Sequence, residues 1–561
     1  MLESNESNNI SLDTIIAEES HQVEQTRNLC DLTSPNILEG RLRAKSCSSA
    51  NIVSSCAFLT SSAEPCSFEQ AIQSKESKKW VKAMQEEYNF LIKNGTWILV
   101  YPPKGQKIID NRWVYRIKRN PDDGVNRYKA RLVARGFLQS YGVDYTETFS
   151  PVVKFTSIRT LFAIAAKRKM FIKQFDVQTA FLYGELDEEL YMQQPVGFHD
   201  STSRVCKLVK SLYGLKQSPR LSDTDPCVFL RKEGAEATYL AIFVDDGLVI
   251  STSETYIHPV IQYLGQHFHI KVFSAHYFLG IEIYRLPDGS IFLNQEAYTN
   301  KVLENFGFIN SNPVATPADY NQILEIEGKV AEVNFPYRQA VGSLLYLAIG
   351  TRPDISFAVG YVSRFMEHPS KAHVAALMRI LSYLKGTNDF GILFSCNINN
   401  FEFCIYSDAD YAGCIQTRRS TTGYCLTLGT GIVSWCSERQ ASVSHSTAES
   451  EYIAASQASR ELVWLKRLLA ELDVQLESEK PVLYVDNESA VKLIKNPVLH
   501  KRTKHIEVRY HFVRETYEDK SFDVRGIPSE KQLADIFTKA LPKRRFQDLR
   551  QKLNIINNVL Y

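Results

Sequence analysis

Two adjacent carboxylates between short apolar runs are the residues of this sequence best suited to bind a divalent metal ion. Asp245 and Asp246 follow Ala241–Val244 and precede Gly247 and Leu248–Ile250. Apolar runs of this length, interrupted by turn-forming residues, predict two strands joined by a tight turn that holds both acids. Adjacent negative charges beside a core resist desolvation, so a cation is expected nearby, and oxygen ligands suit Mg²⁺. An exposed Asp-Asp-Gly turn on an ordinary hairpin is the alternative.

A third acid and a basic segment could serve the same chemistry. Asp176 lies at the end of an apolar segment that begins at Phe171 and predicts a strand, although a strand-end Asp can also cap a helix. Within residues 127–136, Lys129 and Arg131 alternate with apolar residues, so a strand would place both on one face. Such a face suits the oxygens of a triphosphate, and a solvated strand surface would have the same pattern.

The C-terminal part of the chain has its own acids on several predicted elements. Glu449 lies in the first turn of a helix predicted over residues 447–472, where the helix dipole favours a negative charge. The others are Asp408 on a strand within 401–413, Glu451 on the same helix, Asp486 at the end of a strand within 481–487, and Asp535 on a helix over 530–541.

Composition limits the class of protein. A length of 561 residues predicts several domains, and 44% hydrophobic with 23% charged residues is ordinary for a soluble globular protein. The net charge of +2 gives no overall basic field, so a nucleic-acid surface would have to come from local clusters. The 11 Cys show no CxxC spacing, and the sequence shows neither a signal peptide nor a long apolar run, which predicts a reduced, intracellular, non-membrane protein.

Periodicity and composition predict the remaining elements. Residues 1–66 are rich in Ser, Asn and Glu and are expected to form a disordered leader, with order beginning near Ser67. Gly95 is the expected C-cap of the first helix. The predicted elements are helices over 68–94 and 155–170, strands over 97–101 and 112–118, and a helical stretch over 337–394.

Five motifs, several of them long, follow one another between Arg127 and Asp246. They are RYKARLVARGF, ETFSPVVKFTSIRTL, QFDVQTAFLYGELDEELYMQQPVGF, LYGLKQSPR and FVDD. In this order they resemble the reverse transcriptase of copia-type LTR retrotransposons, and the resemblance runs from about Trp80 to the C-terminus. It implies an α+β multidomain fold: a right-hand polymerase with fingers, palm and thumb, followed by an α/β ribonuclease H-like domain.

The resemblance also implies a polymerase site, by position within these motifs. Two Mg²⁺ ions, or Mn²⁺, would activate the primer 3′-hydroxyl and stabilise the leaving pyrophosphate. Phe243 stands where the family usually has Tyr. The implied residues are Asp176, Asp245 and Asp246 for the ions, Lys129 and Arg131 for the triphosphate, Phe181 against the sugar, where it excludes a 2′-hydroxyl, and Gly214 and Ser218 in a segment that can approach the base pair.

The order of elements in the C-terminal part resembles ribonuclease H. The resemblance implies two further metal ions, about 4 Å apart, that clamp the scissile phosphate and activate water. Glu451 is preferred to Glu449 because the family's acid is followed three residues later by Ala, here Ala454. Many ribonucleases H have a His on the loop before the last acid, but GIPSEKQLAD has none; His505 could be structural or catalytic. The implied metal ligands are Asp408, Glu451, Asp486 and Asp535.

One departure from the family is large. Arg220 is followed at once by LSDTDPCVFL, where the family has a Trp-containing helix and loop, so we infer an internal deletion, real or from a faulty gene model. A palm sheet needs a helix on its back to bury its apolar face. Without that helix the apolar residues of the sheet are expected to become exposed, and polymerase activity is expected to be impaired. Asp176 should still meet Asp245 and Asp246, because the apolar pattern sets strand register. The ribonuclease H domain, with its own core, is expected to remain active.

The resulting prediction is an RNA-directed DNA polymerase with ribonuclease H activity, from a retrotransposon Pol polyprotein. Its expected partners are RNA and DNA template-primers, RNA–DNA hybrids and deoxynucleoside triphosphates, and no membrane association is expected. The expected location is cytoplasmic virus-like particles or the nucleus. The oligomeric state is left open. The alternatives are a decayed or domesticated nucleic-acid-binding remnant and a chain in which only ribonuclease H works. The predicted domains are the leader over 1–66, fingers and palm over 67–310, truncated near 220/221, thumb and connection over 311–395, and the ribonuclease H-like domain over 396–561.

Overall fold

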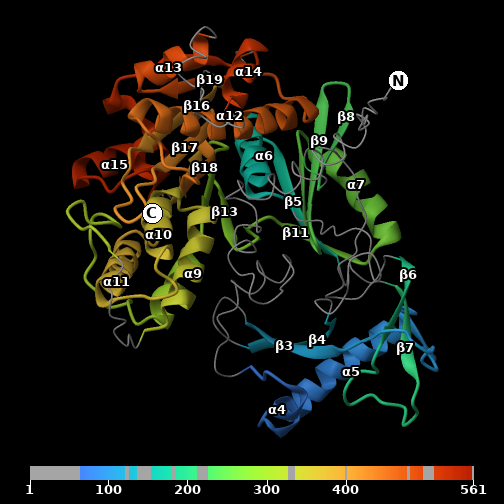
Figure 1. Ribbon diagram of the computed structural model, residues 1–561. Coiled ribbons are helices and arrows are strands. Elements are labelled where there is room, and N and C mark those ends of the chain that lie inside the picture. Colours follow the sequence, from blue (N-terminus) through green and yellow to red (C-terminus); the bar gives the residue numbers. More distant parts are fainter. Residues whose placement is uncertain are drawn as a thin grey trace, which may run out of the picture.

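A computed structural model describes residues 64–119, 125–135, 153–177, 185–210, 225, 227–325, 335–397, 401–476, 480–496 and 511–558. Within these residues the strands form five sheets, and Figure 1 shows them in an N-terminal unit, a central sheet, and a connecting and a C-terminal unit. No helix in these segments is both long and apolar enough to cross a membrane. Several predicted features lie outside the described residues: Phe181, Gly214, Ser218, His505, the Arg220–Leu221 junction and most of the predicted leader.

The N-terminal unit consists of two helices packed on two small sheets. Its strands are β1 (Trp97–Val100), β2 (Ile108–Ile109), β3 (Asn111–Arg119), β4 (Val125–Ala134), β6 (Glu185–Met192) and β7 (Val205–Lys210). Helices α4 (Phe68–Gln73) and α5 (Ser77–Lys93) replace the single predicted helix, and Gly95 follows α5 with a φ of 64°, as a C-cap glycine does. Glu64, which precedes the predicted start of order, already accepts a hydrogen bond from the Ile117 N–H at 2.8 Å.

The central sheet is antiparallel, in the order β11-β5-β10-β9-β8, and a helix covers each face. Its strands are β5 (Phe171–Val177), β8 (Val228–Glu233), β9 (Glu236–Phe243), β10 (Asp246–Ser251) and β11 (Ile270–Ser274). Helix α7 (Glu254–His267) packs on one face, where Ile257 clusters with Phe175 and Val249. Helix α6 (Phe155–Lys167) packs on the other face.

The predicted loss of cover over this sheet is wrong for its central strand β10. Leu248, Val249 and Ile250 are all 0% exposed, because successive side chains of β10 point to opposite faces, toward α6 or α7. Asp225, just before β8, accepts a hydrogen bond from Ser157 Oγ in α6. The apolar residues of β10 therefore stay covered despite the inferred deletion, whereas Val272 and Phe273 of the edge strand β11 are 41% and 43% exposed.

A connecting unit joins the central sheet to the C-terminal part of the chain. Its sheet has the order β12-β13-β14-β15-β21, so its last strand comes from the C-terminal end. The stretch predicted as helical ends in a strand, because Gly391–Phe394 pairs with β14 instead of extending a helix. The elements are β12 (Tyr277–Phe278), β13 (Ile281–Arg285), β14 (Ile291–Asn294), α8 (Glu296–Asn305), α9 (Tyr337–Gly350), η3 (Pro353–Ile355), α10 (Ser356–Ser363), α11 (Lys371–Lys385), β15 (Gly391–Phe394) and β21 (Ile555–Ile556).

The C-terminal unit is a mixed sheet in the order β18-β17-β16-β19-β20, with helices around it. Strand β16 pairs antiparallel with β17 and parallel with β19, and α12 packs on β16 and β17. The elements are β16 (Phe403–Asp410), β17 (Thr421–Leu428), β18 (Gly431–Arg439), α12 (Thr447–Glu471), β19 (Val482–Val485), α13 (Glu488–Lys495), α14 (Phe512–Glu518), β20 (Asp523–Gly526), η6 (Ser529–Lys531), η7 (Leu533–Phe537) and α15 (Lys543–Lys552).

The helix predicted around Asp535 is wrong. The segment forms two short 3₁₀ helices, η6 and η7, between Pro528 and Pro542. Proline lacks a backbone N–H, and 3₁₀ turns are common where a helix cannot extend. Gln532, between the two, donates from its side chain to Ser407 O at 2.8 Å and so fixes η7 against β16.

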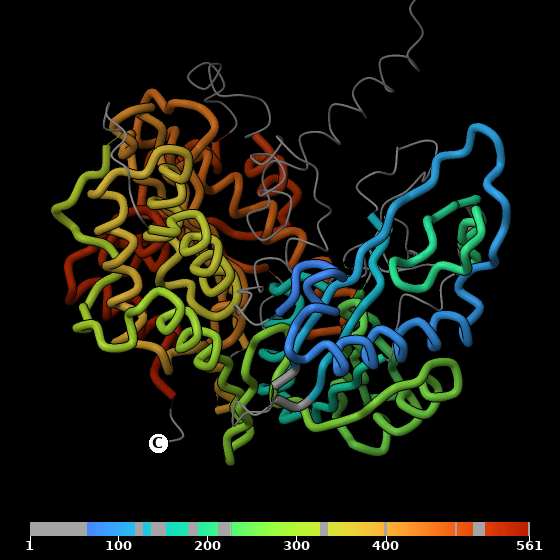
Figure 2. Tube along the Cα trace, turned by 90° about the horizontal axis from the view of Figure 1, so that it is seen from below, coloured from blue at the N-terminus to red at the C-terminus, as the bar shows by residue number. Residues whose placement is uncertain are grey.

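One hydrophobic core runs through the central sheet, the connecting unit and the C-terminal unit, so the expectation of a separate C-terminal core is wrong. Helix α6 packs against β18 as well as β10. The buried Arg159 of α6 donates from Nε to Val433 O and from Nη1 to Ile349 O, both at 2.7 Å. Figure 2 shows the N-terminal and central parts, in blue and green, beside the yellow to red C-terminal half.

Two candidate active sites

The first candidate site lies at one end of the central sheet, at the turn between β9 and β10. Asp246 is the first residue of β10 and pairs in register with Asp176 in β5. The turn consists of Val244 and Asp245, and the Val177 N–H donates to Asp245 O at 2.6 Å. The turn predicted to hold both acids therefore holds only Asp245. Strand pairing brings the three acids to the same end of the sheet.

The backbone next to these acids is unusual in two places. Val244 has a φ of 60°, which is rare for a β-branched residue and indicates strain at the turn. Gly247, expected as a turn residue, lies inside β10, where an added Cβ would come within 2.2 Å of Phe175 Cζ. The glycine is therefore required by the close approach of the Phe175 ring.

A cation of the N-terminal unit reaches the first site. Arg131 in β4 places Nη2 3.2 Å from Asp245 Oδ2, with 37% and 23% of the two side chains exposed. Lys129 lies two residues earlier in the same strand and therefore on the same face. The ion pair holds a guanidinium group beside the acids.

Glu87 was not among the predicted site residues, yet it is a buried acid behind this basic strand. Glu87 is 8% exposed, and its Oε1 has no hydrogen-bond partner among the described residues. Burial raises the pKa of Glu87, while the positive charges of Arg131 and Lys129 oppose that rise. The sequence does contain a signal, because Glu87 falls on the apolar stripe of α5 that Trp80 and Leu91 define.

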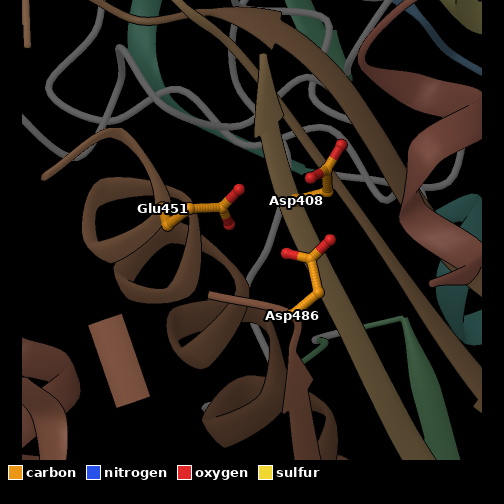
Figure 3. A group of neighbouring side chains, drawn as sticks. All are labelled: Asp408, Glu451 and Asp486. Carbon is orange, nitrogen blue, oxygen red and sulfur yellow. The ribbon is translucent and has the colours of Figure 1, made fainter. Parts of the chain in front are cut away.

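The second candidate site gathers three carboxylates from three elements of the C-terminal unit. Asp408 in β16, Glu451 in α12 and Asp486 directly after β19 offer oxygens that all lie within 4.8 Å of one another. Figure 3 shows the three side chains turned toward a common space. Parallel pairing sets Ser407 opposite Val485, so the acids that follow them lie side by side. Nowhere else in the described part of the chain do three His, Cys, Asp or Glu side chains meet this closely.

Burial dominates the electrostatics of this second site. It raises the pKa of Asp408 to about 6, with Asp535 and Asp486 adding to the rise and Lys539 opposing it. Burial also raises the pKa of Glu451 well above its usual value, reinforced by the charges of Asp408 and Asp486. The pKa of Asp486 is raised too, again mainly by burial. Each carboxylate charge therefore costs free energy that a proton or a bound cation would offset.

The oxygens of the second site fit a hard divalent cation. Glu451 Oε1 accepts a hydrogen bond from the Ala409 N–H at 3.2 Å, whereas the buried Oε2 has no hydrogen-bond partner among the described residues. Asp486 Oδ2 accepts from Ser529 Oγ at 3.0 Å, which orients that carboxylate. Converging carboxylates, one with an unpartnered oxygen, match the ligand set that Mg²⁺ prefers.

Asp535 lies beside this group but is paired with two cations. Its Oδ1 is 2.8 Å from Lys539 Nζ, and its Oδ2 is 3.2 Å from Arg545 Nη2. Lys539 Nζ also lies 3.7 Å from Asp408 Oδ2. Lys539 was not among the predicted residues, although its spacing of four from Asp535 is one at which helical side chains meet.

Glu449 and Glu451 have different surroundings. Ser446 Oγ accepts from the Glu449 N–H at 3.2 Å, and Glu449 Oε2 accepts from the His445 N–H at 2.8 Å. Glu449 thus closes the N-terminus of α12, as a capping acid does. Glu451, half a turn further on, is the residue whose carboxylate joins Asp408 and Asp486.

Known proteins resemble this chain over most of its length. The family described as "Reverse transcriptase (RNA-dependent DNA polymerase)" matches residues 94–320. The retrovirus-related Pol polyproteins from transposon TNT 1-94 of Nicotiana tabacum and transposon RE1 of Arabidopsis thaliana are each 41% identical, over 526 and 506 residues. These matches cover 88% and 86% of this chain, and the chain spans 39% and 34% of the two relatives.

Two further matches differ in weight. The N-terminal ribonuclease H domain of a Mycobacterium tuberculosis protein, solved as a fusion with maltose-binding protein, is 12% identical over 27% of this chain and 97% of that chain, with a TM-score of 0.17. The transposon Ty5-1 protein of Saccharomyces cerevisiae is 30% identical over 308 residues, which are 51% of this chain and 100% of that relative. The chain therefore belongs to the copia-type retrotransposon Pol polyproteins, and it carries their reverse transcriptase domain.

Proposed function

We propose that this chain polymerises DNA on an RNA or DNA template and cleaves the RNA strand of RNA–DNA hybrids. The observation that supports polymerisation most is the register that sets Asp246 opposite Asp176 inside the matched reverse transcriptase segment. Cleavage is supported by the three carboxylates that converge in the C-terminal unit. The substrates are deoxynucleoside triphosphates with an RNA or DNA template-primer, and RNA–DNA hybrids.

At the polymerase site, Asp176, Asp245 and Asp246 would hold Mg²⁺ in the palm, and the chemistry that Mg²⁺ supplies when bound is activation of the primer 3′-hydroxyl and stabilisation of pyrophosphate. Arg131 leaves Asp245 to bind the triphosphate, since guanidinium groups match phosphate oxygens. Lys129, on the same strand face of the fingers, adds a second positive charge.

The remaining polymerase roles belong to three residues of the family motifs. Phe181 packs under the sugar and excludes a 2′-hydroxyl, because a large ring without a hydroxyl leaves no room or partner for it. Gly214 and Ser218 shape the backbone that approaches the base pair. These roles rest on the resemblance of the motifs, and the three residues lie outside the described part of the chain.

At the ribonuclease H site, Asp408, Glu451, Asp486 and Asp535 would hold Mg²⁺, which supplies an activated water and charge neutralisation at the scissile phosphate when bound. Because burial raises the pKa of Asp408 and Glu451, protons compete with the metal ion for these carboxylates as the pH falls. Ser529 orients the Asp486 carboxylate by a hydrogen bond of 3.0 Å.

A narrower function is favoured by one feature of the sequence. Arg220 is followed at once by Leu221, without the helix that the family has there, so hybrid cleavage alone is the second candidate function. A non-enzymatic remnant is disfavoured, because the acids of both sites are retained.

Primer extension on an RNA template, run beside hybrid cleavage, separates these functions. We expect Asp176→Asn to abolish extension and to leave cleavage unchanged. Cleavage without any extension by the parent chain would leave only the narrower function. Phe181→Val should raise ribonucleotide incorporation relative to deoxyribonucleotide incorporation, and an unchanged ratio in an active variant would remove Phe181 from sugar selection.

A further inference from the structure

One lysine of the chain lies inside the acidic site of the C-terminal unit. Lys539 Nζ is 2.8 Å from Asp535 Oδ1 and 3.7 Å from Asp408 Oδ2. The side chains of Asp408 and Asp535 are 4% and 9% exposed, whereas that of Lys539 is 46% exposed. The ammonium group therefore bridges two buried carboxylates from the solvent side.

These contacts divide the site into two halves. In one half, Asp408, Glu451 and Asp486 lie within 4.8 Å of one another, and Glu451 Oε2 is buried without a hydrogen-bond partner among the described residues. In the other half, Asp535 faces Lys539 with one oxygen and Arg545, at 3.2 Å, with the other. The first half is open to a cation, and the second already contains positive charge.

We propose that the Lys539 ammonium group occupies the second cation position of this site, between Asp408 and Asp535, while no nucleic acid is bound. The free protein then takes up one divalent ion, at Asp408, Glu451 and Asp486, and a second only after Lys539 has left Asp535. The physical reason is competition, since an ammonium group and a divalent ion repel each other and need the same carboxylate oxygens. The inference rests on the proposed ribonuclease H function and adds to it a residue that controls metal occupancy.

A neighbouring cavity gives the displaced side chain a place to move. The cavity has a volume of about 250 Å³, and Lys539 lines it together with Thr538, Asp410 and Arg364. Asp410 belongs to β16 and is half-buried. A lysine that leaves Asp535 can therefore turn toward Asp410 and keep an anionic partner.

The test counts the divalent ions bound by the full chain without nucleic acid, by isothermal titration calorimetry with Mn²⁺. Every protein carries Asp176→Asn and Asp246→Asn, so that the ions counted belong to the C-terminal site. The parent is expected to bind one ion. Lys539→Met and Lys539→Gln are expected to bind two ions under the same conditions.

Two variants are matched controls for charge. Lys539→Arg keeps a cation at the position and is expected to bind one ion. Lys543→Met removes the same charge from an exposed position at the start of α15, and its ion count should equal that of the parent. Circular dichroism shows which variants are folded. Because two uncharged substitutions of Lys539 are used, the test can still be read if one of these variants does not fold.

The ion counts distinguish the role of Lys539 from the existence of the metal site. Two ions in the parent, or one ion of unchanged affinity in both uncharged variants of Lys539, would overturn the role of Lys539 and leave the ribonuclease H function standing. No ion in the parent or in any variant would overturn the metal site itself, and with it the proposed cleavage activity.

Discussion

Arg131 of strand β4 and Asp245 of the β9–β10 turn form an ion pair, with 3.2 Å between Nη2 and Oδ2, although they are 114 residues apart in the sequence. The pair joins the N-terminal unit to the end of the central sheet where Asp246 lies opposite Asp176. Nucleotide binding has to break this pair if the same guanidinium binds the triphosphate. The contact thus positions the cation beside the acids.

Arg131→Ala should lower kcat/KM for nucleotide incorporation by about 10- to 100-fold, because a hydrogen bond to a charged group contributes about 1.5–3 kcal/mol. Single-nucleotide extension kinetics give this value. Arg127→Ala is the control, since Arg127 is on the same strand but forms an exposed ion pair with Glu86 at 3.1 Å and should change little. Equal kcat/KM for Arg131→Ala and the parent would contradict the assigned role.

Gly247→Ala should destabilise the chain by about 1–3 kcal/mol, as overpacking of a core does. The added Cβ would lie 2.2 Å from Phe175 Cζ, so the ring has to move. Gly265→Ala in α7 is the matched control, because nothing lies within 4 Å of its added Cβ and Ala favours a helix by about 1 kcal/mol. Thermal unfolding should show changes of opposite sign, and an unshifted midpoint for Gly247→Ala would show that Phe175 adapts.

The apolar pattern was enough to predict the strands that carry most of the acids. Asp176 lies near the end of β5 and Asp486 directly after β19, because period-2 apolar runs mark strands and polar residues mark their ends. The sequence places the turn too late, at Asp245 and Asp246, because Gly247 has the appearance of a turn glycine. In the structure the turn consists of Val244 and Asp245. The actual reason for Gly247, the ring of Phe175, is a contact between two strands that no local pattern contains.

Features set by distant contacts could not be predicted. Arg159 lies in an apolar helix, and only its partners Val433 and Ile349, far away in the sequence, explain why a buried arginine is tolerated there. The cover on one face of the central sheet depends on α6, which packs against both β10 and β18, a contact between distant segments that no local pattern contains. The pairing of Lys539 with Asp535 has a local spacing signal, but its approach to Asp408 does not.

Mg²⁺ should stabilise the folded chain at pH 8 and have little effect at pH 5. Burial raises the pKa of Asp408 from 3.8 to about 6 and raises that of Glu451. Without metal, the folded chain keeps protons that the unfolded chain has released, so the stability from these groups is greatest below the unfolded pKa and is lost as the pH rises through about 6. A bound ion offsets that loss at pH 8, but at pH 5 it competes with the protons.

The measurement is the Tm with and without Mg²⁺ at both pH values, in a chain that carries Asp176→Asn and Asp246→Asn. Adding Asp486→Asn should reduce the rise at pH 8, because one ligand is lost. A rise in Tm at pH 5 as large as the one at pH 8 would show that these carboxylates are not the groups that bind the ion.

Arg159→Met should lower stability by about 3 kcal/mol or more, because buried carbonyl groups lose their donor. It should also reduce extension and hybrid cleavage together, since α6 belongs to the core that both parts share. Arg467→Met on the exposed face of α12 is the control and should stay within about 0.5 kcal/mol. Loss of only one activity, with the other at the parent level, would show that the two parts fold independently.

Cleavage of a labelled RNA–DNA hybrid by the purified chain and by Asp486→Asn tests most directly whether the carboxylates of the C-terminal unit form an active site. We predict Mg²⁺-dependent cleavage of the RNA strand by the parent and a loss of about 100-fold or more in Asp486→Asn, because a metal ligand is removed. The Tm of the variant without metal should be equal or slightly higher, since one repulsive charge is gone. Asp519→Asn, at an exposed position after α14, should cleave like the parent. Cleavage by Asp486→Asn at the rate of the parent would contradict the site.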